Sequence, residues 1–180
     1  ALFTLRDKFP FQSECLRLML HTGMRAEECK KITREMITTD EDGDPIILLK
    51  RYIAKGRTQQ QQKDITYDIT TPIREVLDSV KYQLDKPKYK PYQFVPWLFP
   101  TTRISKEKMA TPEVNPGYTQ SHSTRLKPRG LNDCWKKVRA MSGVEGSIKS
   151  LRKTYATNSV DLLGLENASK TTKHKNQNTL

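Results

Sequence analysis

The stretch SECLRLMLHTGMRAEECKKI, residues 13–32, decides how the first part of this chain folds. Apolar residues from Leu16 to Leu20 recur at the three- and four-residue spacing of one helix face, and Gly23 supplies a helix end. A second helical pattern follows Arg25, where two glutamates favour the positive end of a helix and Ile32 can face the core. The stretch therefore predicts two consecutive helices with an arginine at the turn between them.

The next part of the chain alternates between apolar runs and turn signals. Residues 36–39, the run IILLKRYI at 46–53 and the run KDITYDI at 63–69 have strand-like composition, and DEDGD at 40–44 separates the first two. Short strands joined by short connections pair with their neighbours in sequence. We therefore expect a small antiparallel meander of three strands.

Helical patterns dominate the remainder of the chain. Thr71 and Pro72 give N-cap and first-position signals for a helix. Its apolar stripe consists of Ile73, Val76, Leu77, Val80 and Leu84. Further helical patterns occupy 131–141 and 147–164, whereas 86–130 reads as a loop with short elements and the tail is polar. The fold class predicted is α+β: mainly helical, with a small three-stranded antiparallel sheet.

Composition indicates a polyanionic partner. The 180 residues include 32 Lys and Arg against 20 Asp and Glu, a net charge of +12 with a pI near 9.7. Nucleic acid fits better than a membrane, because no long amphipathic helix separates the basic residues from an apolar face. No apolar run reaches the roughly 18 residues of a membrane span, and the chain does not start with a secretory signal. We expect a soluble protein.

The three cysteines show no metal or redox spacing. Cys15, Cys29 and Cys134 are odd in number and far apart in sequence. We interpret them as reduced thiols that face the core. No set of metal ligands and no phosphate-binding glycine loop is recognisable either, so we expect neither a metal nor a nucleotide cofactor.

Several basic residues could act on a phosphate, and each also has a plain structural explanation. Arg25 lies near a helix start, where free backbone NH groups favour an anion, but it could equally pair with a neighbouring carboxylate. Lys149 and Arg152 project from one face of a predicted helix and could share a phosphate or form a solvated basic face. Lys55, expected at a hairpin tip, and His174, between two tail lysines, could be ordinary solvent-exposed residues.

Four stretches of the chain follow one another in a distinctive order. They are LMLHTGMRAEECKKITREMI, IAKGRTQQQQKDITYDIT, SIKSLRKTYATNSVDLLG and KTTKHKNQNTL. Their order and content resemble the catalytic domain of tyrosine recombinases, the phage integrase family. The first stretch contains TGxRxxE, the second the hairpin lysine, the third a version of HxLRxTxAT and the fourth a degraded LGHxxxxxT, in which Lys173 replaces the glycine.

The resemblance implies a catalytic site and a mechanism. The implied catalytic residues are Arg25, Lys55, Lys149, Arg152 and His174, with Glu28 as an acidic supporting residue. Lys149 stands where the family usually has histidine. The family cleaves and rejoins DNA through a 3′-phosphotyrosyl intermediate, in which the two arginines hold the scissile phosphate and the hairpin lysine protonates the leaving 5′ oxygen. Neither a metal nor ATP is implied.

The nucleophilic tyrosine of the family follows the histidine of the last motif, so it would lie beyond Leu180. We interpret Tyr155 as a packed aromatic and not as its replacement. An N-terminal DNA-clamping domain is also missing, so residues 1–180 are expected to be a truncated catalytic domain that is inactive alone.

The implied partners are double-stranded DNA and, in the full-length protein, further copies of itself in a tetramer on DNA. The implied location is the cytoplasm, at the host nucleoid, and a phage or mobile element is the implied source. Two alternatives stay open: a catalytically silent DNA-binding module of the same fold, and a type IB topoisomerase.

Overall fold

The computed structural model describes residues 1–50, 64–101 and 124–172 of the chain. Its helices are α1 (Pro10–Thr22), α2 (Ala26–Cys29), α3 (Thr71–Asp85), α5 (Pro128–Ser142) and α6 (Lys149–Thr172). Two short 3-10 helices are η1 (Arg34–Met36) and η3 (Lys90–Phe94), and the strands are β1 (Ile37–Thr39), β2 (Pro45–Leu49) and β3 (Ile65–Asp68). The chain is therefore a mainly helical α+β protein, as the sequence predicts.

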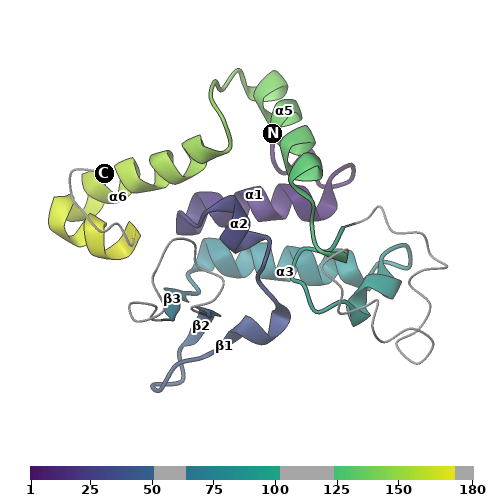
Figure 1. The fold of residues 1–180 in the computed structure, drawn as a ribbon, viewed down its shortest axis with the longest axis horizontal. Helices are drawn as coiled ribbons and strands as arrows, with labels where there is room; N and C mark the ends of the chain where they lie inside the picture. The colour runs from purple at the N-terminus through teal and green to yellow at the C-terminus, as the bar shows by residue number, and fades with distance from the viewer. Residues whose placement is uncertain (51–63, 102–123, 173–180) are drawn as a thin grey trace.

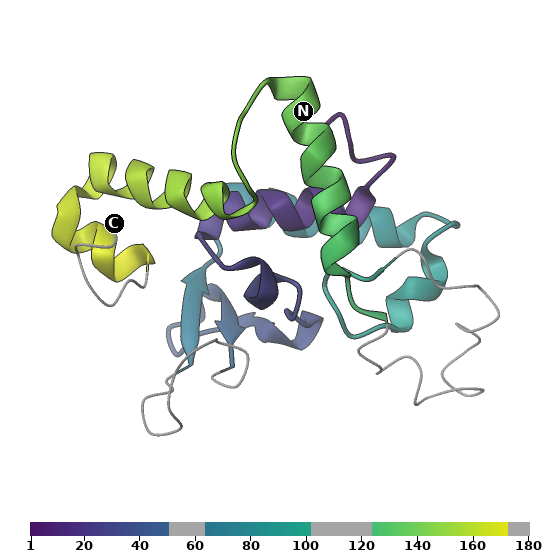
Figure 2. The same ribbon diagram turned by 45° about the horizontal axis from the view of Figure 1, so that its top comes forward.

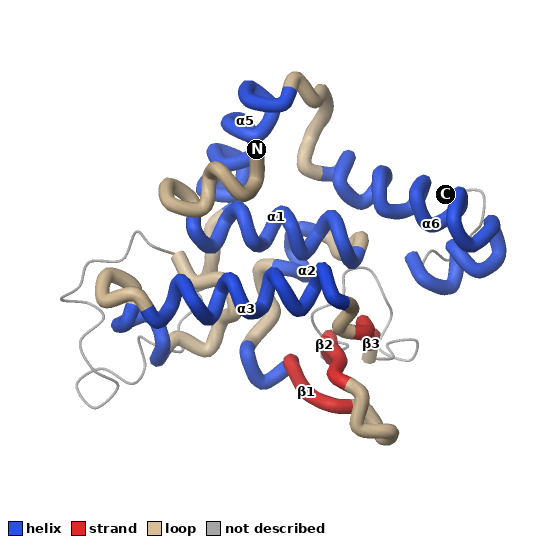
Figure 3. The backbone as a smooth tube through the Cα atoms, turned by 180° about the vertical axis from the view of Figure 1, so that it is seen from behind, coloured by secondary structure: helices blue, strands red, loops and turns tan. Residues whose placement is uncertain are grey.

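Helix α1 lies at the centre of the molecule. Figure 1 shows α1 and α3 side by side, with α5 and α6 on one side of this pair and the small sheet on the other. The turned view keeps the same arrangement (Figure 2), and the view from behind shows α3 along α1 with the sheet at one end of the pair (Figure 3). Because α1 contacts α2, α3, α5 and α6, it is buried on almost every side.

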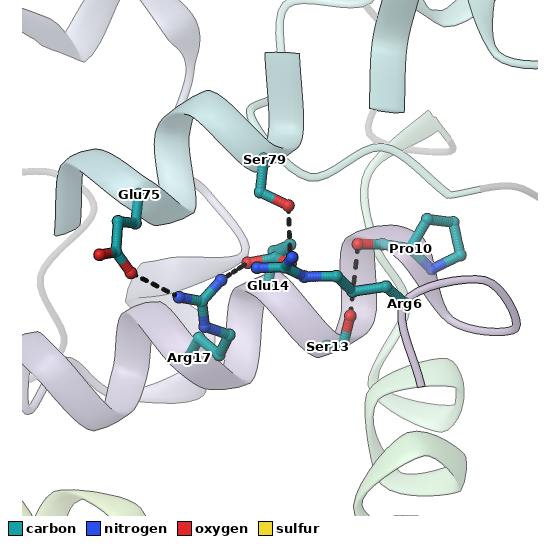
Figure 4. A network of polar contacts seen from close by, with 7 residues as sticks. All are labelled: Arg6, Pro10, Ser13, Glu14, Arg17, Glu75 and Ser79. Carbon is teal, nitrogen blue, oxygen red and sulfur yellow. Dashed lines mark hydrogen bonds and ion pairs between the residues drawn. The ribbon is translucent and has the colours of Figure 1, made fainter. Parts of the chain in front are cut away.

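Polar residues of α1 are buried in a network that joins it to α3 (Figure 4). The fully buried Glu14 carboxylate accepts hydrogen bonds from Arg6 Nε at 2.6 Å, Arg17 Nη1 at 2.7 Å and Ser79 Oγ at 2.9 Å. Arg17 also reaches Glu75 at 3.4 Å. Since Glu14 meets Ser79 while the later Arg17 meets the earlier Glu75, the two helices run antiparallel. The network compensates the buried charges and holds α1 against α3.

The sheet is antiparallel in the order β1-β2-β3, which confirms the predicted meander. Ile47 of β2 pairs with Ile37 on one side and with Tyr67 on the other. In β3 the side chains of Ile65 and Tyr67 are buried while the residues between and after them are exposed, the period-two pattern of a strand with one face on the core.

The elements differ from the predicted ones mainly at their ends. Met36 belongs to η1 and not to a strand, β2 ends at Leu49, and the rest of the predicted 46–53 strand falls outside the described residues. The N-cap of α3 is Thr70 and not Thr71, and its side chain makes no capping hydrogen bond. Helix α6 continues to Thr172, well beyond the predicted end at residue 164, so Gly164 does not end it.

All three cysteines are free and buried, as predicted. Cys15 Sγ lies 3.4 Å from Cys29 Sγ, where α1 meets α2. Burial is the main cause that raises the pKa of the Cys29 thiol, and it raises the pKa of Cys134 to about 12. The thiols of Cys29 and Cys134 therefore remain protonated, and all three cysteines pack as small apolar groups.

Candidate active site

The candidate site begins at the sharp turn that ends α1. Gly23 adopts a left-handed conformation with φ +64°, and its NH donates to Met19 O at 2.9 Å. Thr22 Oγ1 donates to Leu18 O and accepts from the NH of Met24, whose side chain is fully buried. Because Met24 is anchored in the core, the next residue, Arg25, is directed outward, and its side chain is 53% exposed.

Glu28 holds Arg25 at two points. Glu28 Oε2 accepts from the backbone NH of Arg25 at 2.8 Å, and Oε1 accepts from Arg25 Nη1 at 3.1 Å. The Glu28 side chain is only 3% exposed, so its carboxylate is held in place by the surrounding core and orients the guanidinium of Arg25. Arg25 therefore does pair with a neighbouring carboxylate, an alternative that the sequence left open. More than half of the Arg25 side chain stays accessible despite this pairing.

Arg152 of α6 reaches the same turn from the other end of the sequence. Its Nη1 donates to the carbonyl oxygen of Gly23. Gly23 is two residues before Arg25, so the two arginines approach the same turn. Burial is the main cause that lowers the pKa of Arg152, and the charge of Arg25 lowers it further. Two neighbouring cations repel, and a bound anion between them would relieve that repulsion.

The ring of Tyr155 locks α6 onto the turn. A Cβ atom built on Gly23 would lie 2.4 Å from Tyr155 Cδ1, so only glycine allows this approach. Burial raises the pKa of the Tyr155 hydroxyl. The side chain is thus a packed aromatic, as predicted, and its contact with Gly23 brings Arg152 to its position one turn earlier in α6.

Tyr67 is a site neighbour that the sequence did not single out. Burial raises the pKa of its hydroxyl; the Glu28 carboxylate adds to the rise, and Arg152 and Arg25 oppose it. The hydroxyl therefore lies within electrostatic reach of Glu28 and of the two arginines. The alternation of β3 could have predicted a buried Tyr67, but nothing local indicated that its hydroxyl would come within reach of these charges.

Further charged groups lie around α2. Lys30 Nζ lies 2.6 Å from Glu27 Oε1, and the Lys30 side chain is 2% exposed. The hydrogen bond from Lys30 is the main cause that lowers the pKa of Glu27; burial opposes it, and the charges of Arg125 and Lys31 add to it. This side of the turn carries more positive than negative charge.

The other predicted site residues are Lys149, Lys55 and His174. Lys149 is the exposed first residue of α6, one turn before Arg152. Lys55 and His174 lie outside the described residues. The structure thus brings together Arg25, Glu28 and Arg152, with Lys149 on the same helix as Arg152.

No protein-family model and no curated protein matches the sequence. Solved structures do match. XerH site-specific recombinase bound to difH substrate in a pre-cleavage complex gives a TM-score of 0.61 at 17% identity, over 97% of this chain and 42% of that one. The post-cleavage complex of XerH with a palindromic difH substrate gives a TM-score of 0.60 at 16% identity, over 93% of this chain and 40% of that one. A lambda integrase dimer bound to a COC′ core site gives a TM-score of 0.62 at 13% identity, over 99% of this chain and 53% of that one.

The chain has the fold of a tyrosine recombinase catalytic domain. It spans between 40% and 53% of the length of these solved chains. Within the described part of the chain, no helix is both long and apolar enough to cross a bilayer. The arginine pair at the end of α1 therefore belongs to a fold whose solved representatives here are recombination proteins bound to DNA.

Proposed function

We propose that this chain is the catalytic domain of a tyrosine recombinase, which cuts and rejoins duplex DNA at specific sites through a 3′-phosphotyrosyl intermediate. The observation that carries the proposal is the meeting of Arg25 and Arg152 at one turn, with Glu28 fixed beneath Arg25. Arg25 and Arg152 lie far apart in the sequence. Their convergence is what a site for a single phosphate requires.

The chemistry of the pair suits phosphodiester cleavage. Attack of a tyrosine oxygen on the phosphorus spreads negative charge over the non-bridging oxygens, and preorganised cations stabilise that charge. A guanidinium stays charged and donates two parallel hydrogen bonds to one phosphate. Since Glu28 and the Gly23 carbonyl already orient the two arginines, little reorganisation is needed when DNA binds.

The remaining roles come from the family resemblance. Lys149 and His174 would complete the phosphate pocket by hydrogen bonding, and Lys55 would protonate the leaving 5′ oxygen. The nucleophile is a tyrosine outside residues 1–180. We further propose that the complete protein works as a tetramer on DNA in the cytoplasm, at the nucleoid, and that it comes from a phage or mobile element.

The distribution of charge supports duplex DNA as the substrate. Helix α5 buries one face, which includes Leu131, Cys134 and Val138, and exposes cations on the opposite face, which are Arg129, Lys136 and Arg139. An exposed row of cations on a helix can follow a phosphate backbone. The solved XerH and lambda integrase structures with this fold are bound to DNA.

The test uses the complete gene product that contains these residues and a nicked suicide substrate, which traps the covalent intermediate. We expect a 3′ adduct with the wild type and none with Arg152→Ala. Lys153→Gln is the matched control, because Lys153 is the next residue of α6 and is exposed. Normal cleavage by Arg152→Ala would refute the site.

Two further assays on the same gene product separate the alternatives: DNA binding, and the reaction of a supercoiled plasmid that carries two sites. Binding without any adduct from the wild type would indicate a silent DNA-binding module. Relaxation of supercoils without recombinant junctions between two sites would indicate a type IB topoisomerase.

A further inference from the structure

A second basic surface lies at the far end of the α1–α3 pair. The turn after α3 carries Lys86, Lys88 and Lys90, and we call residues 86–90 the lysine turn. Lys88 and Lys90 are exposed, and two large exposed aromatic side chains flank the turn: Tyr82 at 66% and Phe94 at 55%. None of the candidate site residues belongs to this surface.

The lysine turn is held firmly to the core. The NH groups of Tyr89 and Lys90 donate to Lys86 O at 2.8 and 3.0 Å. The Tyr89 ring is buried against Phe11 of α1, with the ring centroids 5.5 Å apart. A ligand would therefore meet a preformed turn and would not have to order a loose segment.

Aromatic rings also position two of the cations. Lys86 Nζ lies 5.0 Å from the centroid of the Tyr82 ring, and Lys88 Nζ lies 5.4 Å from that of Tyr89. The adjacent acid, Asp85, accepts a hydrogen bond from Gln93 Nε2 at 2.9 Å. The surface thus combines fixed cations, which can contact phosphates, with exposed aromatic side chains, which can pack against the adjoining sugars of a duplex.

The distance from the arginine pair follows from helix geometry. Because α1 and α3 are antiparallel, the lysine turn, which follows α3, and Arg25, which follows α1, lie at opposite ends of the pair. In Figure 1 the end of α3 and helix α6 lie on opposite sides of the molecule. The 15 residues of α3 span roughly 20 Å. This separation corresponds to about 6 base pairs of duplex.

The start of α5 lies at the same end of the molecule. A Cβ atom on Gly130 would lie 3.5 Å from Gln12 Nε2, so the first turn of α5 rests on the first turn of α1. The exposed Arg129 of that turn adds positive charge near the lysine turn. A duplex that occupies the arginine pair and passes along α5 would approach this end.

We propose that the lysine turn is a second contact for the backbone of duplex DNA, about 6 base pairs from the phosphate held by Arg25 and Arg152. The inference rests on the proposed function, because it assumes that DNA occupies the arginine pair. Lys88 and Lys90 supply the phosphate contacts, and Phe94 and Tyr82 cover the adjoining sugars. The contact adds affinity and fixes the direction of the duplex, and it takes no part in the chemical step.

The test measures the binding of the full chain to a duplex of about 24 base pairs, by fluorescence anisotropy over a series of salt concentrations. The double variant K88Q/K90Q should lower the slope of log affinity against log salt by about two, and should bind about tenfold more weakly at low salt. The matched control is R74Q/K81Q, which removes the same charge from two exposed positions of α3 beside the sheet. The control should keep the wild-type slope.

The outcomes separate this inference from the proposed function. If the wild type binds and K88Q/K90Q keeps the wild-type slope, the inference fails and the proposed function stands. An equal decrease in the salt slope for K88Q/K90Q and R74Q/K81Q would also overturn the inference, because net charge alone would then explain the effect. If the wild type binds no duplex at any salt concentration, both proposals fail together.

Discussion

The substitution Gly23→Ala tests how the turn after α1 assembles the site. It adds one methyl group at a residue with φ +64° whose added Cβ would lie 2.4 Å from Tyr155 Cδ1 and 3.0 Å from Cε1. The ring belongs to the helix that carries Arg152, so it cannot withdraw without moving its neighbours. We therefore expect losses in both stability and DNA affinity.

Two terms make up the stability loss. Alanine in a left-handed conformation costs about 1–2 kcal/mol. Overpacking against the Tyr155 ring adds about 1–3 kcal/mol. Gly143→Ala is the matched control: Gly143 ends α5 with φ +67°, and a Cβ there meets nothing within 4 Å. Gly143→Ala should cost only the free energy of placing alanine in a left-handed conformation. The free energies of unfolding of the two variants should therefore differ by about 1–3 kcal/mol.

Urea denaturation gives the two free energies of unfolding. Each kcal/mol should also lower the melting temperature by about 2–4 °C in a chain of this size. In a Tyr155→Ala background the extra cost of Gly23→Ala should disappear, because the ring is gone. Equal losses for Gly23→Ala and Gly143→Ala would refute the packing of α6 on the turn. Unchanged DNA affinity in Gly23→Ala would refute its role in placing Arg152.

Four further perturbations test other parts of the molecule. Arg25→Lys keeps the charge but loses the paired donors, so adduct formation by the complete gene product should fall about a hundredfold or more; near-normal cleavage would contradict the role of Arg25. Glu14→Gln leaves buried guanidinium charge uncompensated and should cost about 3–5 kcal/mol in urea denaturation. Glu75→Gln, at a side chain that is 61% exposed, should cost less than about 1 kcal/mol, and equal losses would contradict the network. Burial lowers the pKa of His21 from its ordinary 6.5, so the unfolded chain takes up the proton first, and stability is lost as pH falls below 6.5. His21→Gln should lessen that loss over the same pH series. Burial raises the pKa of Cys134 to about 12, so iodoacetamide at neutral pH should label it only when the chain opens, and fast labelling of the native protein would count against that burial.

Local patterns were enough to predict most of the elements. Gly23 ends α1 in the left-handed conformation that a helix-ending glycine predicts, and the alternation of Ile65 and Tyr67 predicts β3. Helix α6 was predicted too short, because the residues after Gly164 are polar and carry no apolar stripe, the pattern by which the helix was recognised. These outcomes depend on interactions between residues near each other in sequence.

Long-range contacts were beyond local patterns. The motifs assigned Arg25, Glu28 and Arg152 to one site by resemblance, but no spacing rule predicts that Arg152 donates to the carbonyl of Gly23, 129 residues away. The burial of Glu14 was missed for the same reason, since its partners on α3 become neighbours only when the helices pack. Sequence patterns reveal which groups a helix presents, whereas packing decides what those groups meet.

The docking of α6 on the end of α1 also sets when the site comes into existence. During synthesis the turn with Arg25 leaves the ribosome early, while Arg152 follows only after the sheet, α3 and α5. Closing so long a loop is slow compared with forming the local helices. A nascent or partly opened chain therefore lacks the paired guanidinium groups, and any affinity for a phosphate that depends on the pair appears only when folding is complete.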